Sequence, residues 1–494
     1  MKIGFDNELY LKTQSEEIAK RIEKFGGKLY LEFGGKLLDD FHASRVLPGF
    51  QPDSKLRMLK NLSHIAEIVI VINAADIESN KRRGDLDITY DADVLRLIDE
   101  YEKLGLYVGS VVISQYANQP AANLFKKRLK AMKKNVFLQY PIEGYPFNVK
   151  KIVSPDGFGK NDYIKTKKPL IVITAPGPGS GKMSCCLSQL YHDNLRGIKA
   201  GYAKFETFPI WNIPLKHPVN LAYEAATADL DDVNMIDPYH LEAYGKSAVN
   251  YNRDIEVFPV LNAIFEKIEG KSPYRSPTDM GVNMAGNCIT NDEIVSKAAK
   301  EEIIRRYFAA LCEQAKGTSE GIEASKIEIL MNQTGISVEE REVTIAALNR
   351  SLETEGQPAV AIQLEDGKII TGKTSALLGA ASAAMLNAVK AIAGIDKDID
   401  LISPQLIAPI QELKTGILSS VNPRLHTDEV LIALAIASIT DKNAKLAMDT
   451  LSKLKGLEAH STVILSSIDN HTFKKLGINL TSEPRYQEKK LFHK

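Results

Sequence analysis

The sequence predicts an α/β protein whose first part is a doubly wound domain with a mostly parallel sheet. Two patterns over the first 270 residues support this class. Short, nearly continuous apolar runs are typical of strands buried on both faces, and amphipathic stretches between several of them, such as 91–105 and 121–134, predict helices. The expected strands are KLYLEF (28–33), EIVIVI (67–72), YVGSVVIS (107–114), NVFLQY (135–140), LIVIT (170–174) and GYAKFE (201–206). Ligands of such folds bind beyond the carboxyl ends of the strands.

Composition excludes several classes of protein. The 494 residues include 62 basic and 62 acidic side chains, so we expect no basic surface for nucleic acid. The N-terminus MKIGFDNELY lacks the apolar core of a signal peptide, and no apolar run is long enough to span a membrane. The four cysteines have no metal-ligand spacing and suit a reducing compartment. We therefore expect a cytoplasmic protein without membrane or nucleic-acid partners.

The chain is too long for one hydrophobic core, and its patterns divide it into three parts. Residues 1–270 form the α/β domain, and 271–355 form a loop followed by a helical subdomain. Residues 356–494 predict a compact α/β sandwich. The helical subdomain either joins the two α/β units or supports a homo-oligomer.

A glycine-rich stretch, ITAPGPGSGKMS (173–184), directly follows the predicted strand LIVIT and precedes a helix-compatible run. A nucleotide-binding P-loop reads G-x-x-x-x-G-K-[ST], which would place a glycine at 176 and a hydroxyl at 183. This chain has Pro176 and Met183 there. The loop is therefore a degenerate P-loop in the correct position. Its candidate ligand-binding residues are Gly177, Gly179, Ser180, Gly181, Lys182 and Ser184.

The residues of this loop favour the binding of a phosphate or another anion. The alternative is a purely structural turn. Glycines permit close approach of a ligand, and backbone N–H groups at a helix start attract anions. Lys182 adds a full positive charge. Magnesium takes hard oxygen ligands and not a thioether, so Met183 argues against an ordinary magnesium–nucleotide site. A nucleotide is one candidate cofactor, and no metal site is predicted.

A second stretch, GKIITGKT (367–374), fits the P-loop pattern letter for letter but lies in the wrong context. Asp366-Gly367 is typical of a tight turn between the strand-like runs AVAIQLE and KIIT. We therefore predict a β-hairpin here and not a phosphate-binding loop.

Acidic residues downstream of the loop are candidates for catalysis. Glu206 ends the run GYAKFE, at the carboxyl end of its predicted strand. Asp229 and Asp232 belong to the acidic stretch 226–245. Carboxylates in such positions serve as general acids and bases, although helix caps and solvated surface are the alternative for the aspartates.

Two further stretches are candidates for substrate binding. KLYLEFGGKLLDD (28–40) resembles the start of an amino-acid kinase, with Gly34, Gly35 and Lys36 at the matching positions. The resemblance ends there, because the next strand leads into 73–76 (NAAD) and not into a second glycine turn. The loop SPTDMGVNMAGNCITND (276–292) offers Thr278, Asp279 and Asn283 among glycines, a composition that suits either a polar ligand or a structural loop.

The order of elements after residue 356 is similar to cytidine-deaminase-like folds. Within 356–494 there is neither an H-x-E nor a P-C-x-x-C motif, so the sequence predicts no zinc site there and no deaminase activity. His460 lies inside an apolar run and is better explained as a hydrogen-bonded core residue than as a catalytic one.

Three long stretches, 222–245, 276–283 and 458–484, resemble the signatures of a conserved bacterial protein family of uncharacterised function. The resemblance extends over nearly the whole chain. It implies a Rossmann-like N-terminal part, a helical middle and a C-terminal part that resembles the deaminase topology. It implies no activity, substrate or catalytic residue.

Three functional hypotheses follow. The first is an enzyme that binds a phosphorylated small molecule or nucleotide at 177–182 and uses Glu206 or a nearby aspartate as acid or base. Phosphotransferase or ligase chemistry is its sharpest version. The second is an isomerase or lyase acting on a sugar phosphate or carboxylate. The third is a ligand-sensing or assembly protein without catalysis.

Overall fold

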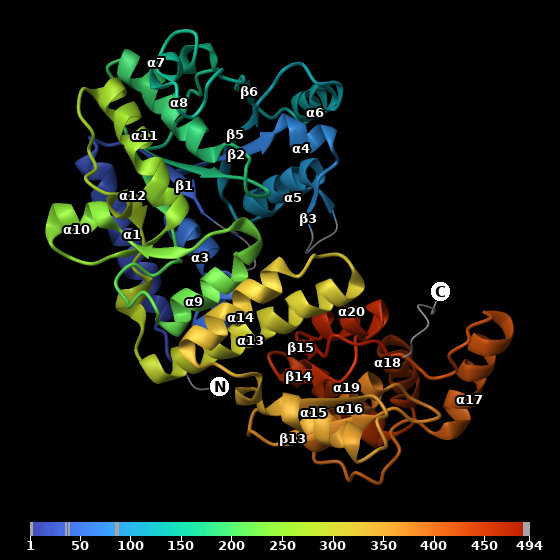
Figure 1. The fold of residues 1–494 in the computed structure, drawn as a ribbon. Coiled ribbons are helices and arrows are strands. Elements are labelled where there is room, and N and C mark those ends of the chain that lie inside the picture. The colour runs from blue at the N-terminus through green and yellow to red at the C-terminus, as the bar shows by residue number, and fades with distance from the viewer. Residues whose placement is uncertain (1–2, 35–36, 38–39, 84–87, 488–494) are drawn as a thin grey trace. The chain divides into compact units, whose positions relative to one another are not determined.

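The computed structural model describes residues 3–34, 37, 40–83 and 88–487 (Figure 1). The chain divides into two compact units, 2–299 and 300–494, each with its own sheet. No helix of the described residues is long and apolar enough to cross a membrane.

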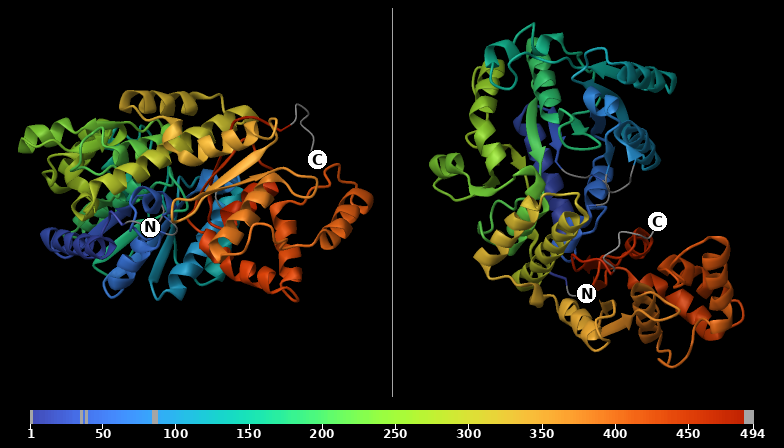
Figure 2. Two further views of the ribbon diagram at one scale, coloured as in Figure 1. Left: turned by 90° about the horizontal axis from the view of Figure 1, so that it is seen from below. Right: turned by 45° about the vertical axis from the view of Figure 1, so that its right-hand side comes forward.

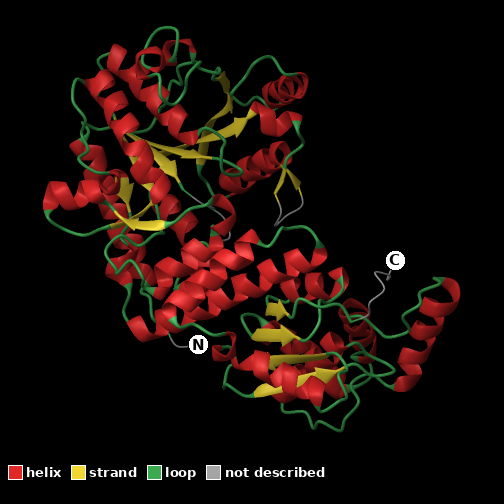
Figure 3. Cartoon of the chain, viewed as in Figure 1, coloured by secondary structure: helices red, strands yellow, loops and turns green. Residues whose placement is uncertain are grey.

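A seven-stranded sheet is the centre of the first unit (Figures 1 and 3). Its strand order is β11-β8-β1-β7-β2-β5-β6, and every neighbouring pair runs parallel. The strands are β1 Leu29–Phe33, β2 Ala66–Asn73, β5 Tyr107–Ser114, β6 Val136–Leu138, β7 Leu170–Thr174, β8 Gly201–Phe205 and β11 Gly281–Val282. All six strands expected from the sequence lie in it. The predicted α/β class with a large parallel sheet is therefore confirmed.

Helices cover both faces of this sheet because its strands are apolar on both faces. Helices α8 (Lys182–Leu195) and α11 (Asn252–Glu269) share one hydrophobic cluster with strand residues such as Tyr30 and Tyr202. On the opposite face, Lys55 of α3 (Ser54–Asn61) lies over the ring of Phe205, and α3 packs on α1 (Asn7–Lys24).

The first unit contains further helices, of which α5 (Tyr90–Lys103) packs on β2 and β5. The helices are α2 Phe41–Val46, α4 Ala74–Glu78, α5 Tyr90–Lys103, α6 Pro120–Ala131, α7 Val149–Ile152, α9 Pro218–Ala226, α10 Pro238–Tyr244 and α12 Pro277–Met280. Two small antiparallel pairs are β3 Arg82–Arg83 with β4 Ile88–Thr89, and β9 Asn234–Ile236 with β10 Val249–Tyr251.

The second unit is built on a four-stranded sheet in the order β13-β12-β14-β15. Its strands are β12 Ala359–Gln363, β13 Ile369–Lys373, β14 Glu458–Ser461 and β15 Asn479–Ser482. The central strand β12 is antiparallel to β13 and β14, while β14 and β15 are parallel. The antiparallel β12–β13 pair, with Gly367 at φ +87°, confirms the predicted hairpin over GKIITGKT.

Helices pack on both faces of the second sheet as well. On one face, α15 (Glu342–Leu352) contacts Ala361. On the other, Val360 joins the cluster formed by α16 (Ala380–Ala393), α18 (Thr427–Ala437) and α19 (Lys442–Thr450). The other helices are α13 Asp292–Lys316, α14 Ile322–Thr334, α17 Pro404–Glu412 and α20 Ser467–Lys475. Residues 271–355, expected as one subdomain, thus contribute to both units.

Arg341, fully buried, connects the helices of the second unit to its sheet. Its guanidinium donates to the carboxylates of Glu301 and Glu458, to the Thr481 hydroxyl, and to the backbone carbonyls of residues 459 and 479. Every N–H of a guanidinium can be satisfied by such a set of acceptors. A buried charge is tolerated only when it is paired and bonded in this way.

We predict that Arg341→Ala lowers the free energy of unfolding of the second unit by about 3 kcal/mol, because Glu301 and Glu458 lose a buried cation. Chemical denaturation followed by circular dichroism measures the effect. The control is Arg350→Ala, which removes a more exposed ion pair with Glu353 and should cost less than about 1 kcal/mol. Equal losses for the two variants would contradict a special role for Arg341.

Candidate functional site

The glycine loop connects β7, an interior strand of the sheet, to α8. Gly179 and Gly181 have φ of +74° and +89°, a region that favours glycine. Gly177 packs against the Tyr90 phenol so closely that a Cβ atom there would lie 2.2 Å from its oxygen. These three positions therefore require glycine for geometric reasons.

Side chains from neighbouring strands hold the loop by its carbonyl groups. The Ser114 hydroxyl, at the end of β5, donates to the carbonyl of Ser180 at 2.6 Å. The Ser180 hydroxyl in turn donates to the carbonyl of Gly177 at 2.8 Å, and the Asn73 amide donates to that of Gly179 at 3.4 Å. With the carbonyl groups bound inside the protein, the amide groups are left for another partner.

The backbone N–H groups from Gly179 to Ser184 donate to no acceptor among the described residues. They surround the start of α8, whose dipole adds partial positive charge. Lys182, the first residue of the helix, is half-buried and forms no ion pair within the described part of the chain. Ser184 lies in the same turn, beside the Tyr145 phenol. This arrangement is suited to an anion.

A cluster of buried charges lies at the same edge of the sheet, at the ends of β1 and β8. The Lys204 ammonium contacts the Glu206 carboxylate at 2.8 Å and also pairs with Asp254 at the start of α11. Tyr251 contacts both Lys204 and Glu206. Glu32 of β1 accepts a hydrogen bond from the Tyr202 phenol at 2.7 Å.

Burial and neighbouring charges alter the protonation of this cluster. Burial raises the pKa of Glu206, and the Asp254 carboxylate raises it further, against the opposing effect of Lys204. Burial alone would lower the pKa of Lys204, but Asp254 and Glu206 raise it well above its usual value. Lys204 therefore stays charged, while Glu206 takes up a proton more readily than an ordinary glutamate.

Strand order brings the loop and the cluster together. β1 lies between β7 and β8, with Glu32 level with Ile173 on one side and Lys204 on the other. Neighbouring strands are about 4.8 Å apart. Burial raises the pKa of Cys186 in α8 and of Tyr202, and the Glu32 carboxylate contributes to both shifts. Glu32 is thus within electrostatic reach of both α8 and β8.

The two candidate aspartates have different surroundings. Asp232 is buried, and one of its oxygens accepts from Arg253 at 3.0 Å while the other has no hydrogen-bond partner among the described residues. Burial raises the pKa of Asp232, and Lys204 opposes this shift, so Asp232 is near the cluster. Asp229 is exposed on a short 3-10 helix.

The candidate substrate-binding glycine Gly34 lies beside the end of β8. Its N–H donates to the Phe205 carbonyl at 3.1 Å, and a Cβ atom would lie 2.9 Å from the same oxygen. Gly35 and Lys36 lie outside the described residues.

The segment around β11 frames the charge cluster, since a Cβ atom on Gly281 would lie 3.0 Å from a Glu206 carboxylate oxygen. Its candidate side chains bond within the chain. Thr278 donates to Asp237 at 2.6 Å, Asp279 accepts from Tyr244 at 2.8 Å, and Asn283 donates to the carbonyl of residue 209 at 2.9 Å. Their contact with a substrate stays a prediction.

Sequence reasoning missed four residues of the cluster: Glu32, Lys204, Tyr251 and Asp254. A signal was present for two of them, because Glu32 and Lys204 are charged residues inside otherwise apolar strands. A buried charge needs a partner, so each implied a nearby charge or hydrogen-bonding group.

Comparison with known proteins identifies the family. The N-terminal part of the domain of unknown function DUF1846 matches residues 3–335, and its C-terminal part matches 339–492. The chain belongs to this family. The DUF1846 match confirms the resemblance that the sequence stretches indicated.

Two streptococcal relatives match over the full length. The UPF0371 protein SpyM3_1021 of Streptococcus pyogenes serotype M3 is 58% identical over 493 residues, which cover 100% of this chain and 99% of the relative. The UPF0371 protein stu1377 of Streptococcus thermophilus is 57% identical over 493 residues, with 100% of both chains covered.

We predict that Lys182→Ala weakens the binding of a phosphorylated ligand about 10- to 100-fold. A charge-assisted hydrogen bond contributes about 1.5–3 kcal/mol, and the fold needs no partner for this side chain. Calorimetric titration of the best ligand from a thermal-shift panel of nucleotides and sugar phosphates measures the loss. Lys127→Ala, at an exposed position of α6, is the control. A ligand whose affinity ignores Lys182 would make the loop a structural turn.

Proposed function

We propose that this DUF1846 protein is an enzyme that binds a phosphorylated small molecule or nucleotide at Gly177–Lys182 and acts on it with Glu206. One observation carries the proposal. A run of backbone N–H groups with no acceptor among the described residues shares the carboxyl edge of the sheet with a buried carboxyl of raised pKa. Perturbed carboxyls beside a binding loop are characteristic of catalytic sites.

The distances across the edge suit a small substrate. A phosphate bound at the start of α8 is two strand spacings, or about 10 Å, from the end of β8. A sugar phosphate or the ribose of a nucleotide spans such a distance. Glu32, on the strand between, is in position to accept hydrogen bonds from hydroxyl groups of the same molecule.

Proton transfer is the chemistry that the charge cluster suits best. A carboxyl with a raised pKa holds its proton at higher pH than usual and can donate it to a leaving or developing oxygen anion. Lys204 fixes the position of Glu206 and stabilises it once the proton has left. Asp232, buried near the same cluster, is the second candidate for proton transfer.

The fold analogy supports the same location for the ligand. We infer that the first unit works as a Rossmann-like domain, whose ligands bind at the carboxyl ends of the strands. The second unit resembles the cytidine-deaminase topology without its zinc motifs. The four cysteines are buried and unpaired, which supports a reducing, cytoplasmic setting.

Two reaction classes use such a site. A phosphotransferase or ligase would work with a magnesium nucleotide. An isomerase or lyase would hold the phosphate without metal and move protons elsewhere on the substrate. Two observations favour the isomerase or lyase class. Met183 has a thioether where a P-loop has its magnesium-binding hydroxyl, and the pKa of Glu206 is raised.

Met183→Ser distinguishes the two classes. If the site holds a magnesium nucleotide, the new hydroxyl should tighten nucleotide binding in the presence of magnesium and leave binding unchanged in its absence. If the phosphate is bound without metal, affinity should change less than about twofold under both conditions, which is less than about 0.4 kcal/mol. Calorimetric titrations with and without magnesium measure both affinities.

We predict that Glu206→Gln lowers turnover about 100- to 10,000-fold and leaves ligand affinity within about threefold, because the amide cannot transfer a proton. Since Glu206 acts in its protonated form, wild-type activity should fall as pH rises through its raised pKa. Turnover of the ligand found in the panel, measured against pH, tests both statements. The control is Glu256→Gln, at an exposed position of α11. Unchanged turnover in Glu206→Gln would exclude Glu206 as the acid.

A further inference from the structure

An apolar arm extends from the second unit at residues 404–421. It consists of α17, the π-helical turn Leu413–Ile417 and the residues that follow. In Figures 1 and 2, α17 points away from the sheet and the other helices of its unit. The arm is anchored at its base by the buried Ile407 and by an ion pair between Lys414 and Glu429 at 2.7 Å.

The outer surface of this arm is rich in apolar side chains. Five large aliphatic side chains are exposed there: Leu406 (38%), Leu413 (45%), Ile417 (78%), Leu418 (66%) and Val421 (89%). Scattered single apolar residues are ordinary on a protein surface, but a group this dense marks an interaction site.

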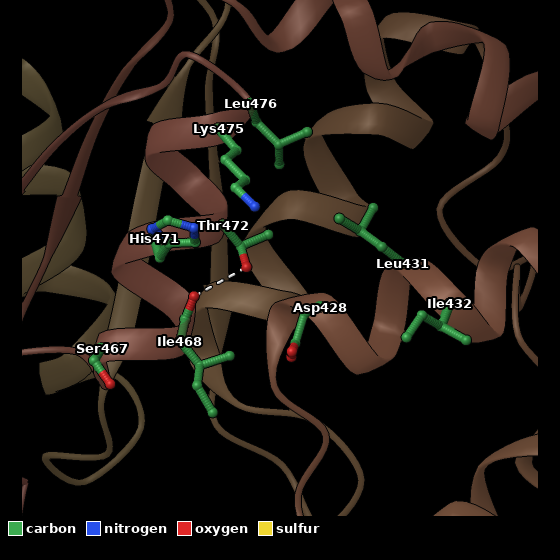
Figure 4. Close-up of a pocket in the computed structure, with 9 residues that line it drawn as sticks. All are labelled: Asp428, Leu431, Ile432, Ser467, Ile468, His471, Thr472, Lys475 and Leu476. Carbon is green, nitrogen blue, oxygen red and sulfur yellow. Dashed lines mark hydrogen bonds between the residues drawn. The ribbon is translucent and has the colours of Figure 1, made fainter. Parts of the chain in front are cut away.

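The same unit carries an apolar groove between α18 and α20, with a volume of about 650 Å³ (Figure 4). Leu431, Ile432, Ile468 and Leu476 supply its apolar lining, and none of the lining residues comes from the arm. Ile436 and Ile439 extend the apolar surface beyond the groove and are 52% and 80% exposed.

Helix α18 is apolar on nearly all sides. Its sequence TDEVLIALAIA buries Val430, Ala433 and Leu434 on one face and presents Ile432 and Ile436 to solvent on another. A helix that is apolar all round is typically covered on every side. The exposed face of α18 therefore lacks a covering partner among the described residues of its own chain.

We propose that a second copy of this chain covers the groove, with the arm of each copy seated in the groove of the other. The chain itself supplies the two complementary apolar surfaces, and a two-fold axis would pair arm with groove twice. This doubles the buried surface, which a stable homodimer needs to reach about 1,200–2,000 Å².

Charge at the two surfaces is complementary as well. Lys475 lies in the groove and is exposed, and Glu412 is exposed on the arm. Neither forms an ion pair within the described part of its own chain. In the reciprocal arrangement, Glu412 of one copy is available to Lys475 of the other. The proposal is independent of the function proposed for the first unit.

Oligomeric state tests the two surfaces separately. By analytical ultracentrifugation, the wild-type chain should be a dimer at micromolar concentration. Ile417→Glu on the arm and Ile432→Glu in the groove should each raise the dissociation constant about 100-fold or more, because each places two charges in the apolar interface. Leu352→Glu, at an equally exposed leucine (76%) on α15, should remain dimeric. A monomeric wild type, or equal behaviour of all three variants, would overturn the proposal.

Disulfide trapping identifies the contact directly. The native cysteines are buried, so they do not compete with introduced thiols. A chain carrying Ile417→Cys is mixed with a differently tagged chain carrying Ile432→Cys and oxidised. A covalent heterodimer should form, whereas Leu352→Cys mixed with Ile432→Cys should give none. Equal yields of covalent heterodimer from both mixtures, in a sample that is dimeric, would contradict the proposed contact between arm and groove. The chains would then associate through another surface.

Discussion

The buried ammonium of Lys204 is the interaction on which the candidate site depends. It joins the end of β8 to the start of α11, because Glu206 follows the strand and Asp254 begins the helix. Without this cation, two carboxylates would be buried side by side, an arrangement that costs several kcal/mol. Burial is the main cause of the raised pKa of Glu206, and Asp254 raises it further, while Lys204 opposes the shift. The contact that joins β8 to α11 thus also places the carboxyl that we propose as the proton donor.

The parallel sheet determines which groups lie near Glu206. All strands end at one edge, so the loop after β7 and the cluster after β8 are separated only by β1 and its Glu32. The loop holds its carbonyl groups inside the protein through Ser114 and Ser180, and its N–H groups from 179 to 184 have no acceptor in the part of the chain that the structure describes. In the proposed site, ligand binding by backbone groups and proton transfer by side chains would thus belong to different strands.

Apolar runs in the sequence were enough to predict six of the strands of the parallel sheet, and Asp366-Gly367 was enough to predict the hairpin. The order of the strands could not be predicted, because the register and the neighbours of each strand depend on packing across the whole unit. The proximity of Glu32 to Lys204 follows from that order and could not be predicted either. Asp229 and Asp232 looked equivalent as sequence. Asp231 between them has φ +57°, and the turn buries Asp232 and exposes Asp229. Such a turn is a property of tertiary context, which the local pattern of aspartates does not reveal.

Hydrogen–deuterium exchange of the first unit tests the central claim most directly, because the claim concerns backbone N–H groups. The measurement compares the free protein with the protein bound to the nucleotide or sugar phosphate that raises its Tm most. We expect slower exchange in two separate segments, 179–184 around the helix start and 201–206 at the end of β8. Protection confined to other segments, with 179–184 exchanging as in the free protein, would contradict it.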